Sequence, residues 1–155
     1  MNEISPPPPA ALLGWRLLAL VYDFFPMFGV WFVVAGGFVA VCGDAVRGGW
    51  LGLLEFVALW AVTGLYAVVS WRRGGQTLGM RPWRLRVVAA DGGSAAWPAL
   101  LKRYAVGTAS LLLAGAGFWW AWIDRDRLTW HDRTSGTRML RAPGKAAGGA
   151  RTRAP

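Results

Sequence analysis

Three apolar runs, at residues 17–41, 51–70 and 104–123, constrain the fold of this 155-residue chain more than any other feature of its sequence. About 20 apolar residues in a helix cross the hydrocarbon core of a bilayer, so each run is long enough to do so. Only 16% of the residues are charged, whereas soluble domains average about a quarter. The sequence therefore predicts an all-α membrane protein whose main partner is the lipid bilayer.

The first two runs are predicted to form a transmembrane helical hairpin. The first run carries one charge, Asp23, and its many Leu, Val and Phe residues offset the cost of inserting that carboxylate, about 3 kcal/mol. The link at residues 42–50 is short, rich in glycine and neutral overall, as expected of a turn on the outer side. We place these two membrane segments at about residues 15–42 and 50–71.

The third run, a membrane segment at about residues 104–123, leaves the topology open. A complete third crossing would put the basic segment 72–103 and the basic C-terminal segment on opposite sides of the membrane, against the positive-inside bias. One resolution is that the small-residue centre, 114–117, bends, so that the run is re-entrant and returns to the side it left. The other is that the C-terminal segment lies outside. We favour the re-entrant segment.

Basic residues lie outside the apolar runs. The chain has 17 Lys and Arg against 8 Asp and Glu, and these cations gather where the cytoplasmic flanks of membrane spans are expected. The distribution favours a multi-pass protein of the cell (inner) membrane with its basic loop in the cytoplasm, and it disfavours nucleic-acid binding. The residues expected to contact anionic lipid head groups are Arg72, Arg73, Lys102 and Arg103.

Two short segments outside the runs, at 84–89 and 137–141, alternate between basic and apolar residues. Such alternation is typical of strands, and segments on one face of the membrane can pair as a small cytoplasmic β-element. We divide the chain into a flexible Pro-rich leader (1–13), a membrane domain (14–141) and a disordered basic tail (142–155).

No pattern in the sequence indicates an enzyme, a cofactor or a metal site. The GGQTLGMR segment at 74–81 lacks the Lys-Ser/Thr pair of a phosphate-binding loop. His131 is the only histidine and Cys42 the only cysteine, so neither a metal cage of these ligands nor a disulfide scaffold can form. Ser135, His131 and Asp132 lie close in sequence, but no nucleophile-elbow motif accompanies them.

Arg16 and Asp23 form the constellation with the most functional information. They lie seven residues apart and share one face of the predicted helix, about 10.5 Å apart along its axis. We therefore expect a water or a third group to bridge them, and we expect Pro26 to kink the helix beside the carboxylate. An ionisable residue within a span is a candidate cation or proton site. The alternative is a polar clamp that holds the helices together.

Three motifs, RLLALVYD at 16–23, GGQTLGMRPWRLRVV at 74–88 and WHDRTSGTRML at 130–140, resemble the RDD family of small membrane proteins. That family is named for one arginine and two aspartates, and the resemblance implies that these are Arg16, Asp23 and Asp132. The family more often has Lys and Gly at the positions of Met80 and Arg84. The resemblance covers roughly residues 14–141 and implies a bacterial setting and a role in transport.

Asp132 and the function each allow two interpretations. Asp132 is either a residue that caps or turns the chain after the third run or a second carboxylate that returns to Arg16 and completes an Arg–Asp–Asp cluster, which requires the re-entrant topology. The leading hypothesis for the function is participation in the transport of a cation or proton, with Asp23 as the exchanging group and a homo-oligomer enclosing the pathway. The alternative is a non-transporting membrane scaffold or assembly partner whose Arg and Asp residues specify helix packing.

Overall fold

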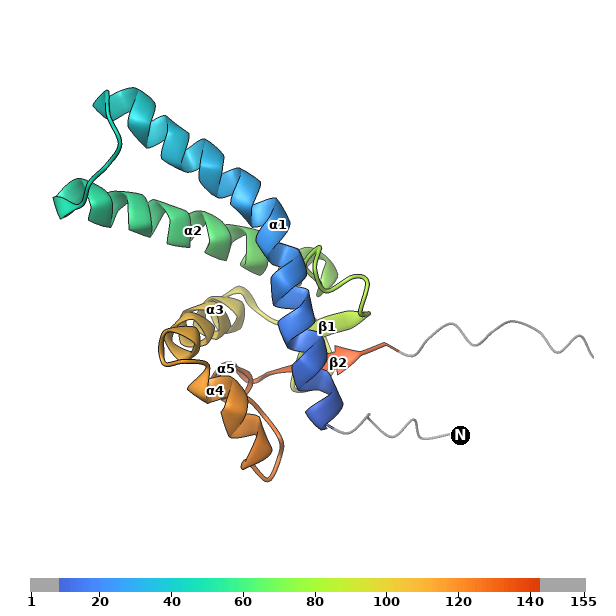
Figure 1. Ribbon diagram of the computed structural model, residues 1–155. Coiled ribbons are helices and arrows are strands. Elements are labelled where there is room, and N and C mark those ends of the chain that lie inside the picture. The colour runs from blue at the N-terminus through green and yellow to red at the C-terminus, as the bar shows by residue number, and fades with distance from the viewer. Residues whose placement is uncertain (1–8, 143–155) are drawn as a thin grey trace, which may run out of the picture.

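A computed structural model describes residues 9–142, which form helices and one two-stranded sheet (Figure 1). Most of the expected leader (1–8) and of the expected basic tail (143–155) lies outside the described residues. The elements in chain order are α1 (Pro9–Cys42), α2 (Gly49–Gly74), β1 (Leu85–Ala89), α3 (Trp97–Leu112), α4 (Ala116–Trp119), the 3-10 turn η1 (Trp120–Trp122), α5 (Trp130–Ser135) and β2 (Thr137–Arg141).

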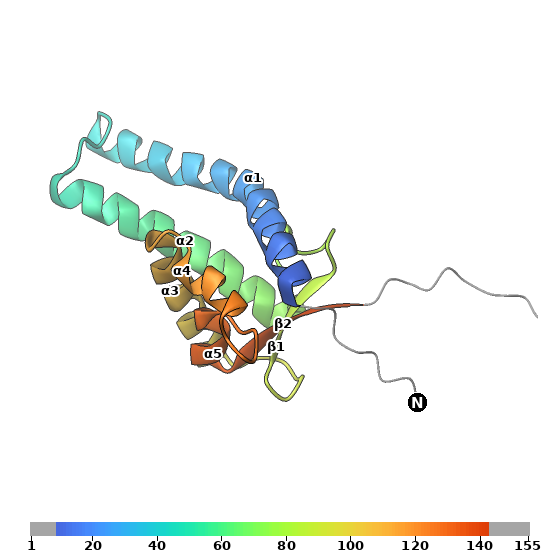
Figure 2. The same ribbon diagram turned by 60° about the horizontal axis from the view of Figure 1, so that its bottom comes forward.

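The helices α1 and α2 form the hairpin that the first two runs predict. Both are long and apolar enough to cross a membrane, and large apolar side chains such as Phe25, Phe32 and Val33 are exposed along α1. Such a surface is stable in hydrocarbon and not in water. α1 begins at Pro9, so residues 9–13, expected in the leader, are helical. Pro26 lies inside α1, and α1 changes direction part-way along its length (Figure 2), as expected beside a proline.

The third run is broken at its glycine-rich centre, as predicted. α3 and the segment formed by α4 and η1 meet at 106°, the geometry of a broken span or of a re-entrant loop. Ala114 and Gly115 both have positive φ at the break, 53° and 76°, a conformation in which α3 cannot continue. α3 starts at Trp97, before the run itself, because Pro98 suits the first turn of a helix. Lys102 and Arg103 are therefore helical residues.

The two predicted strands pair. β1 and β2 are antiparallel, with Leu85 opposite Arg141 and Ala89 opposite Thr137. The sheet thus joins the segment that follows α2 to the segment that follows α5 (Figure 1). These two segments lie side by side, as the re-entrant arrangement of the third run requires.

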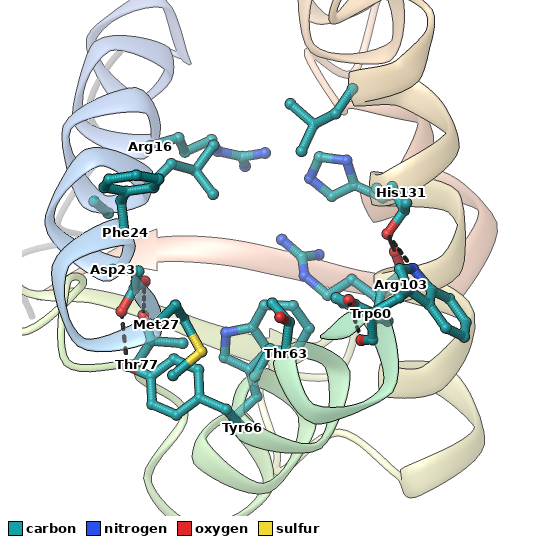
Figure 3. Close-up of a pocket in the computed structure, with 18 of the residues that line it drawn as sticks. Arg16, Asp23, Phe24, Met27, Trp60, Thr63, Tyr66, Thr77, Arg103 and His131 are labelled. Carbon is teal, nitrogen blue, oxygen red and sulfur yellow. Dashed lines mark hydrogen bonds between the residues drawn. The ribbon is translucent and has the colours of Figure 1, made fainter. Parts of the chain in front are cut away.

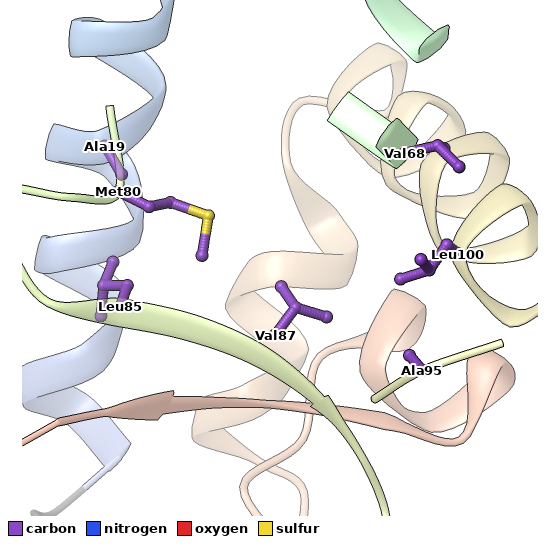
Figure 4. Close-up of a cluster of buried hydrophobic side chains, with 7 residues drawn as sticks. All are labelled: Ala19, Val68, Met80, Leu85, Val87, Ala95 and Leu100. Atoms are coloured by element: carbon purple, nitrogen blue, oxygen red, sulfur yellow. The ribbon is translucent and has the colours of Figure 1, made fainter. Parts of the chain in front are cut away.

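A small apolar core packs where α1, α2, β1 and α3 approach one another (Figure 4). Leu85 of β1 and Leu100 of α3 are completely buried in it. The other buried members are Ala19, Val68, Met80, Val87 and Ala95. Because Ala19 lies between Arg16 and Asp23 along α1, this core fixes the part of α1 that carries the two charged residues.

Candidate functional site

A buried ion cluster joins α1, α3 and α5. Asp132 accepts a hydrogen bond from Arg16 Nη1 at 2.7 Å on Oδ2 and one from Arg103 Nη1 at 2.5 Å on Oδ1. The side chain of Asp132 is completely buried, and those of Arg16 and Arg103 are 8% and 2% exposed. One carboxylate therefore neutralises part of the charge of two guanidinium groups in a place that water hardly reaches.

Hydroxyl groups complete this cluster. Thr129 Oγ1 accepts from Arg16 Nη1 at 3.1 Å, and Thr137 Oγ1 accepts from Arg103 Nη1 at 2.7 Å. Thr129 is also the N-cap of α5, because its side chain accepts from the backbone N–H of Asp132. Asp132 is thus an interior residue of α5 and not the turn residue that one interpretation expected. The short helix aims its carboxylate at Arg16, as the cluster interpretation required, but Asp23 has other partners, so the expected Arg–Asp–Asp cluster does not form.

His131 and Asp132 of α5 have shifted pKa values. Burial alone would raise the pKa of Asp132, but the guanidinium groups of Arg103 and Arg16 hold it well below its usual range. Burial lowers the pKa of His131 from 6.5 to about 3, and the positive charge of Arg103 contributes to the same shift. Near neutral pH, Asp132 is therefore ionised and His131 is neutral.

The shifted pKa of His131 predicts that the protein loses stability in mild acid. Between about pH 6.5 and pH 3 the unfolded chain binds a proton that the folded chain excludes, so stability is complete above this window and falls as the pH drops through it. At pH 5 the loss is about 2 kcal/mol. Thermal unfolding in detergent at pH 7 and pH 5 measures it.

A His131→Gln variant is the control for that prediction. It should be equally stable at pH 7 and pH 5, whatever its absolute stability, because glutamine does not titrate. Asp132 does not interfere, because the stability that its lowered pKa contributes is fully present above its ordinary pKa of 3.8 and is lost only as the pH falls below that value. A wild-type protein with the same stability at both pH values would contradict a buried, neutral His131.

Asp23 is bound by α2 and by the loop that follows it, and not by Arg16. Its carboxylate accepts from the hydroxyl of Tyr66 at 2.7 Å, from the hydroxyl of Thr77 at 2.5 Å and from the backbone N–H of Gly79 at 2.8 Å. The expected link between Asp23 and Arg16 is wrong, because Arg16 turns to Asp132 of α5. The two predicted site residues of α1 therefore belong to two separate polar groups.

The loop after α2 approaches α1 closely at this point. A Cβ atom on Gly79 would lie 2.2 Å from the carbonyl oxygen of Ala19 and 2.7 Å from Cγ of Asp23. Only glycine lets the loop backbone come near enough for its N–H to reach the carboxylate. From the sequence we considered this loop only as a phosphate-binding loop and missed Tyr66, Thr77 and Gly79 as partners of Asp23. The one signal that included two of them was the motif at 74–88.

A pocket of about 680 Å³ lies between α1, α2 and α3 (Figure 3). Its apolar walls include Leu20, Phe24, Met27, Trp31, Leu111 and Leu112. The lining has two polar parts. One contains Arg16, Arg103 and His131, and the other contains Asp23, Tyr66 and Thr77. The pocket therefore connects the buried ion cluster with the site of Asp23.

The four basic residues expected at the lipid head groups differ in their surroundings. Arg72, Arg73 and Lys102 are exposed, and Arg72 donates to Ser94 at 2.7 Å. Arg103 is buried in the ion cluster, which corrects its expected place on the surface. Within residues 9–142, no three His, Cys, Asp or Glu side chains gather as metal ligands would.

Comparison with protein families gives a match over most of the chain. The model of the family described as the RDD family matches residues 10–136. These residues include Arg16, Asp23 and Asp132, and of the two polar groups described above only Thr137 lies just beyond the match. Comparisons with curated proteins and with solved structures gave no significant match.

Proposed function

This chain belongs to the RDD family of membrane-associated proteins, and we propose that it takes part, without enzymatic activity, in the transport of a cation or a proton. The proposal starts from a membrane protein with two long apolar helices and a bent third segment. In it, Asp23 is the group that exchanges the cation or proton. The ion cluster of Arg16, Asp132 and Arg103 keeps its charges and holds the helices in place.

The proposed topology has both ends of the third segment on the cytoplasmic side of the cell (inner) membrane. Paired strands cannot lie on opposite faces of a bilayer, and β1 precedes the third segment whereas β2 follows it. The 106° bend between α3 and the segment formed by α4 and η1 would let the chain return to the side from which it entered the membrane. Arg72, Arg73 and Lys102 are then exposed on the side where basic residues are favoured, and they contact anionic head groups there.

The observation that carries the transport proposal is the uncompensated charge of Asp23. Its three hydrogen-bond partners are two hydroxyls and one backbone N–H, and no basic side chain within residues 9–142 forms an ion pair with it. A carboxylate in an apolar helix is costly without a counter-charge. A proton or a cation arriving through the pocket that Asp23 lines would supply this counter-charge.

Asp132 is unsuited to the same exchange. Two guanidinium groups already compensate its charge and hold its pKa well below the usual range. Proton uptake there would leave both guanidinium groups buried without a counter-charge, which is strongly unfavourable. The two aspartates therefore have different roles in the proposal, Asp23 as the exchanging group and Asp132 as a permanent anion.

Replacing Asp23 by asparagine tests the proposal. The asparagine side chain keeps an oxygen that accepts from the hydroxyl of Tyr66 and from the N–H of Gly79, and its amide can donate to the hydroxyl of Thr77. The loop therefore stays attached, but the side chain cannot ionise. In liposomes containing the purified protein, we expect proton or monovalent-cation flux to fall at least about tenfold in Asp23→Asn, the effect of removing about 1.4 kcal/mol of selective stabilisation. A pH-sensitive dye and ion-selective indicators measure the flux.

Asp44→Asn is the matched control, because Asp44 is exposed in the link between α1 and α2 and pairs there with Arg47 at 3.4 Å. It should transport as the wild type does. Flux that survives in Asp23→Asn, or a wild type without flux, would contradict the proposal.

Light scattering in detergent should show a homo-oligomer, since α1 and α2 with one bent segment are too few to enclose a pathway.

The ion cluster supports a second candidate function, a membrane scaffold or assembly partner. Arg16, Arg103 and Asp132 tie three helices together and leave no oxygen of Asp132 free, as expected of charges that specify packing. In this case wild-type liposomes show no flux, and Asp23→Asn changes the oligomeric mass or the folded fraction. The same two measurements thus separate the candidates.

A further inference from the structure

The pocket between α1, α2 and α3 has an apolar surface and a polar surface, as the binding of an amphiphile requires. One is a long apolar wall formed by side chains of all three helices, including Leu20, Met27 and Leu111. The other is a polar place where Arg16, Arg103 and His131 point inward from α1, α3 and α5 (Figure 3). Such a pairing of an apolar cavity with a few converging polar groups is typical of a ligand site.

The polar place carries an excess of positive charge. Arg16 and Arg103 bring two guanidinium groups and share the single carboxylate of Asp132. All the hydrogen bonds they make to described residues use Nη1, so Nη2 and Nε of each remain available as donors. A guanidinium group presents five N–H donors in a fixed plane that fits phosphate oxygens. The unbalanced charge and the spare donors therefore favour an anion.

His131 supplies an independent sign that a ligand belongs there. It is 4% exposed, and its Nδ1 is buried without a hydrogen-bond partner among the described residues. Trp71 also lines the pocket, and its indole N–H is likewise buried without a hydrogen-bond partner among the described residues. Buried polar atoms are nearly always paired. A head group in the pocket would give both nitrogens a partner.

We infer that the pocket holds one anionic phospholipid, with its phosphate at Arg16, Arg103 and His131 and an acyl chain along the apolar wall. The volume, about 680 Å³, lies within the range of roughly 300–1,000 Å³ that is usual for small-molecule sites. Phe24 and Leu112 on its rim are 49% and 76% exposed. The acyl chain can therefore continue into surrounding hydrocarbon. The phosphate of the lipid lies apart from Asp23, which lines another part of the same pocket, and lipid affinity is measured separately from ion flux.

A bulky residue at Gly107 tests the acyl-chain part. Gly107 lines the pocket one turn after Arg103 on α3, and a Cβ atom there meets nothing within 4 Å. Gly107→Phe therefore adds a ring to the pocket lining at a position where its Cβ atom has room, and it has better helix propensity than glycine. Gly29→Phe is the matched control, because Gly29 has equally open surroundings on α1 and lies outside the pocket lining.

The experiment titrates the full-length protein in non-ionic detergent with phosphatidylglycerol or phosphatidylcholine of identical acyl chains, read by native mass spectrometry. We expect the wild type to bind phosphatidylglycerol at least about tenfold more tightly than phosphatidylcholine. Gly107→Phe should lose about tenfold in affinity for phosphatidylglycerol, and Gly29→Phe should bind as the wild type does. Equal binding of both lipids by the wild type, or wild-type affinity in Gly107→Phe, would overturn the inference.

An Arg72→Gln/Arg73→Gln variant separates the pocket from the exposed basic surface. Both side chains are exposed and outside the pocket lining, so the tight phosphatidylglycerol site should persist in this variant. If the double variant loses the site and Gly107→Phe keeps it, the lipid binds at the surface and the inference is wrong. A change in oligomeric mass in Gly107→Phe without a change in lipid affinity would also overturn it, because a second copy of the chain would then occupy the pocket.

Discussion

Asp132→Asn is expected to destabilise the protein by about 3–5 kcal/mol, the usual result of removing one partner from a buried ion pair. The carboxylate is completely buried and is the only counter-charge that contacts Arg16 and Arg103 in the part of the chain described. Asparagine has the same shape but no charge. Its NH2 group would replace one carboxylate oxygen, so one of the two guanidinium groups would face another donor and lose its acceptor. Thermal or SDS-induced unfolding of the purified protein measures the loss.

The control for this change is Asp44→Asn, in which the same substitution breaks an exposed ion pair. Asp44 and Arg47 are both largely open to solvent, where such pairs contribute little, so its unfolding temperature should stay that of the wild type. If Asp132→Asn is as stable as Asp44→Asn, the cluster does not hold α1, α3 and α5 together.

Gly79→Ala is expected to release the loop after α2 from α1. The added Cβ would lie 2.2 Å from the carbonyl oxygen of Ala19, and neither backbone can give way as a flexible side chain would. Overpacking of this kind costs about 1–3 kcal/mol or more. The backbone N–H would leave Asp23, and the exposed Arg84, which is followed by Leu85, would become easier to cleave. Limited trypsin digestion and thermal unfolding measure the two effects.

Gly74→Ala provides the comparison within the same segment. Gly74 ends α2, and a Cβ atom there meets nothing within 4 Å, so this variant should match the wild type in both measurements. Gly79→Ala protein with wild-type resistance to trypsin would show that the loop does not depend on the close approach to Ala19.

Local patterns in the sequence were sufficient to predict the hairpin, the bend and the sheet. The lengths of the first two runs predicted α1 and α2, and small residues around Gly115 predicted the break after α3. Alternation at 84–89 and 137–141 predicted the paired strands. Each helix, break and strand depends mainly on residues close together in the chain, whereas the pairing of the two strands joins residues about 50 positions apart. Each of these features is present in the structure.

The partners of the charged residues could not be predicted in the same way. Arg16 and Asp23 share a helix, but their separation of about 10.5 Å along its axis leaves Arg16 nearer to a carboxylate from α5. Asp23 accepts hydrogen bonds from Tyr66 of α2 and from Thr77 of the loop that follows α2. The basic residues around Arg103 suggested a surface flank, yet α3 turns Arg103 towards α5 and buries it. Such pairings depend on how the elements pack, which periodicity does not specify.

The bond between Arg16 and Asp132 spans 116 positions in the sequence, and this separation sets an order of events during synthesis. Chains are made from the N-terminus, and α1 emerges long before α5. Until the ribosome has added Asp132, both arginines lack their counter-ion, so α1 cannot adopt its final position against α3. Within the described residues, α5 therefore completes the fold, and a chain that ends before Asp132 would lack the ion cluster.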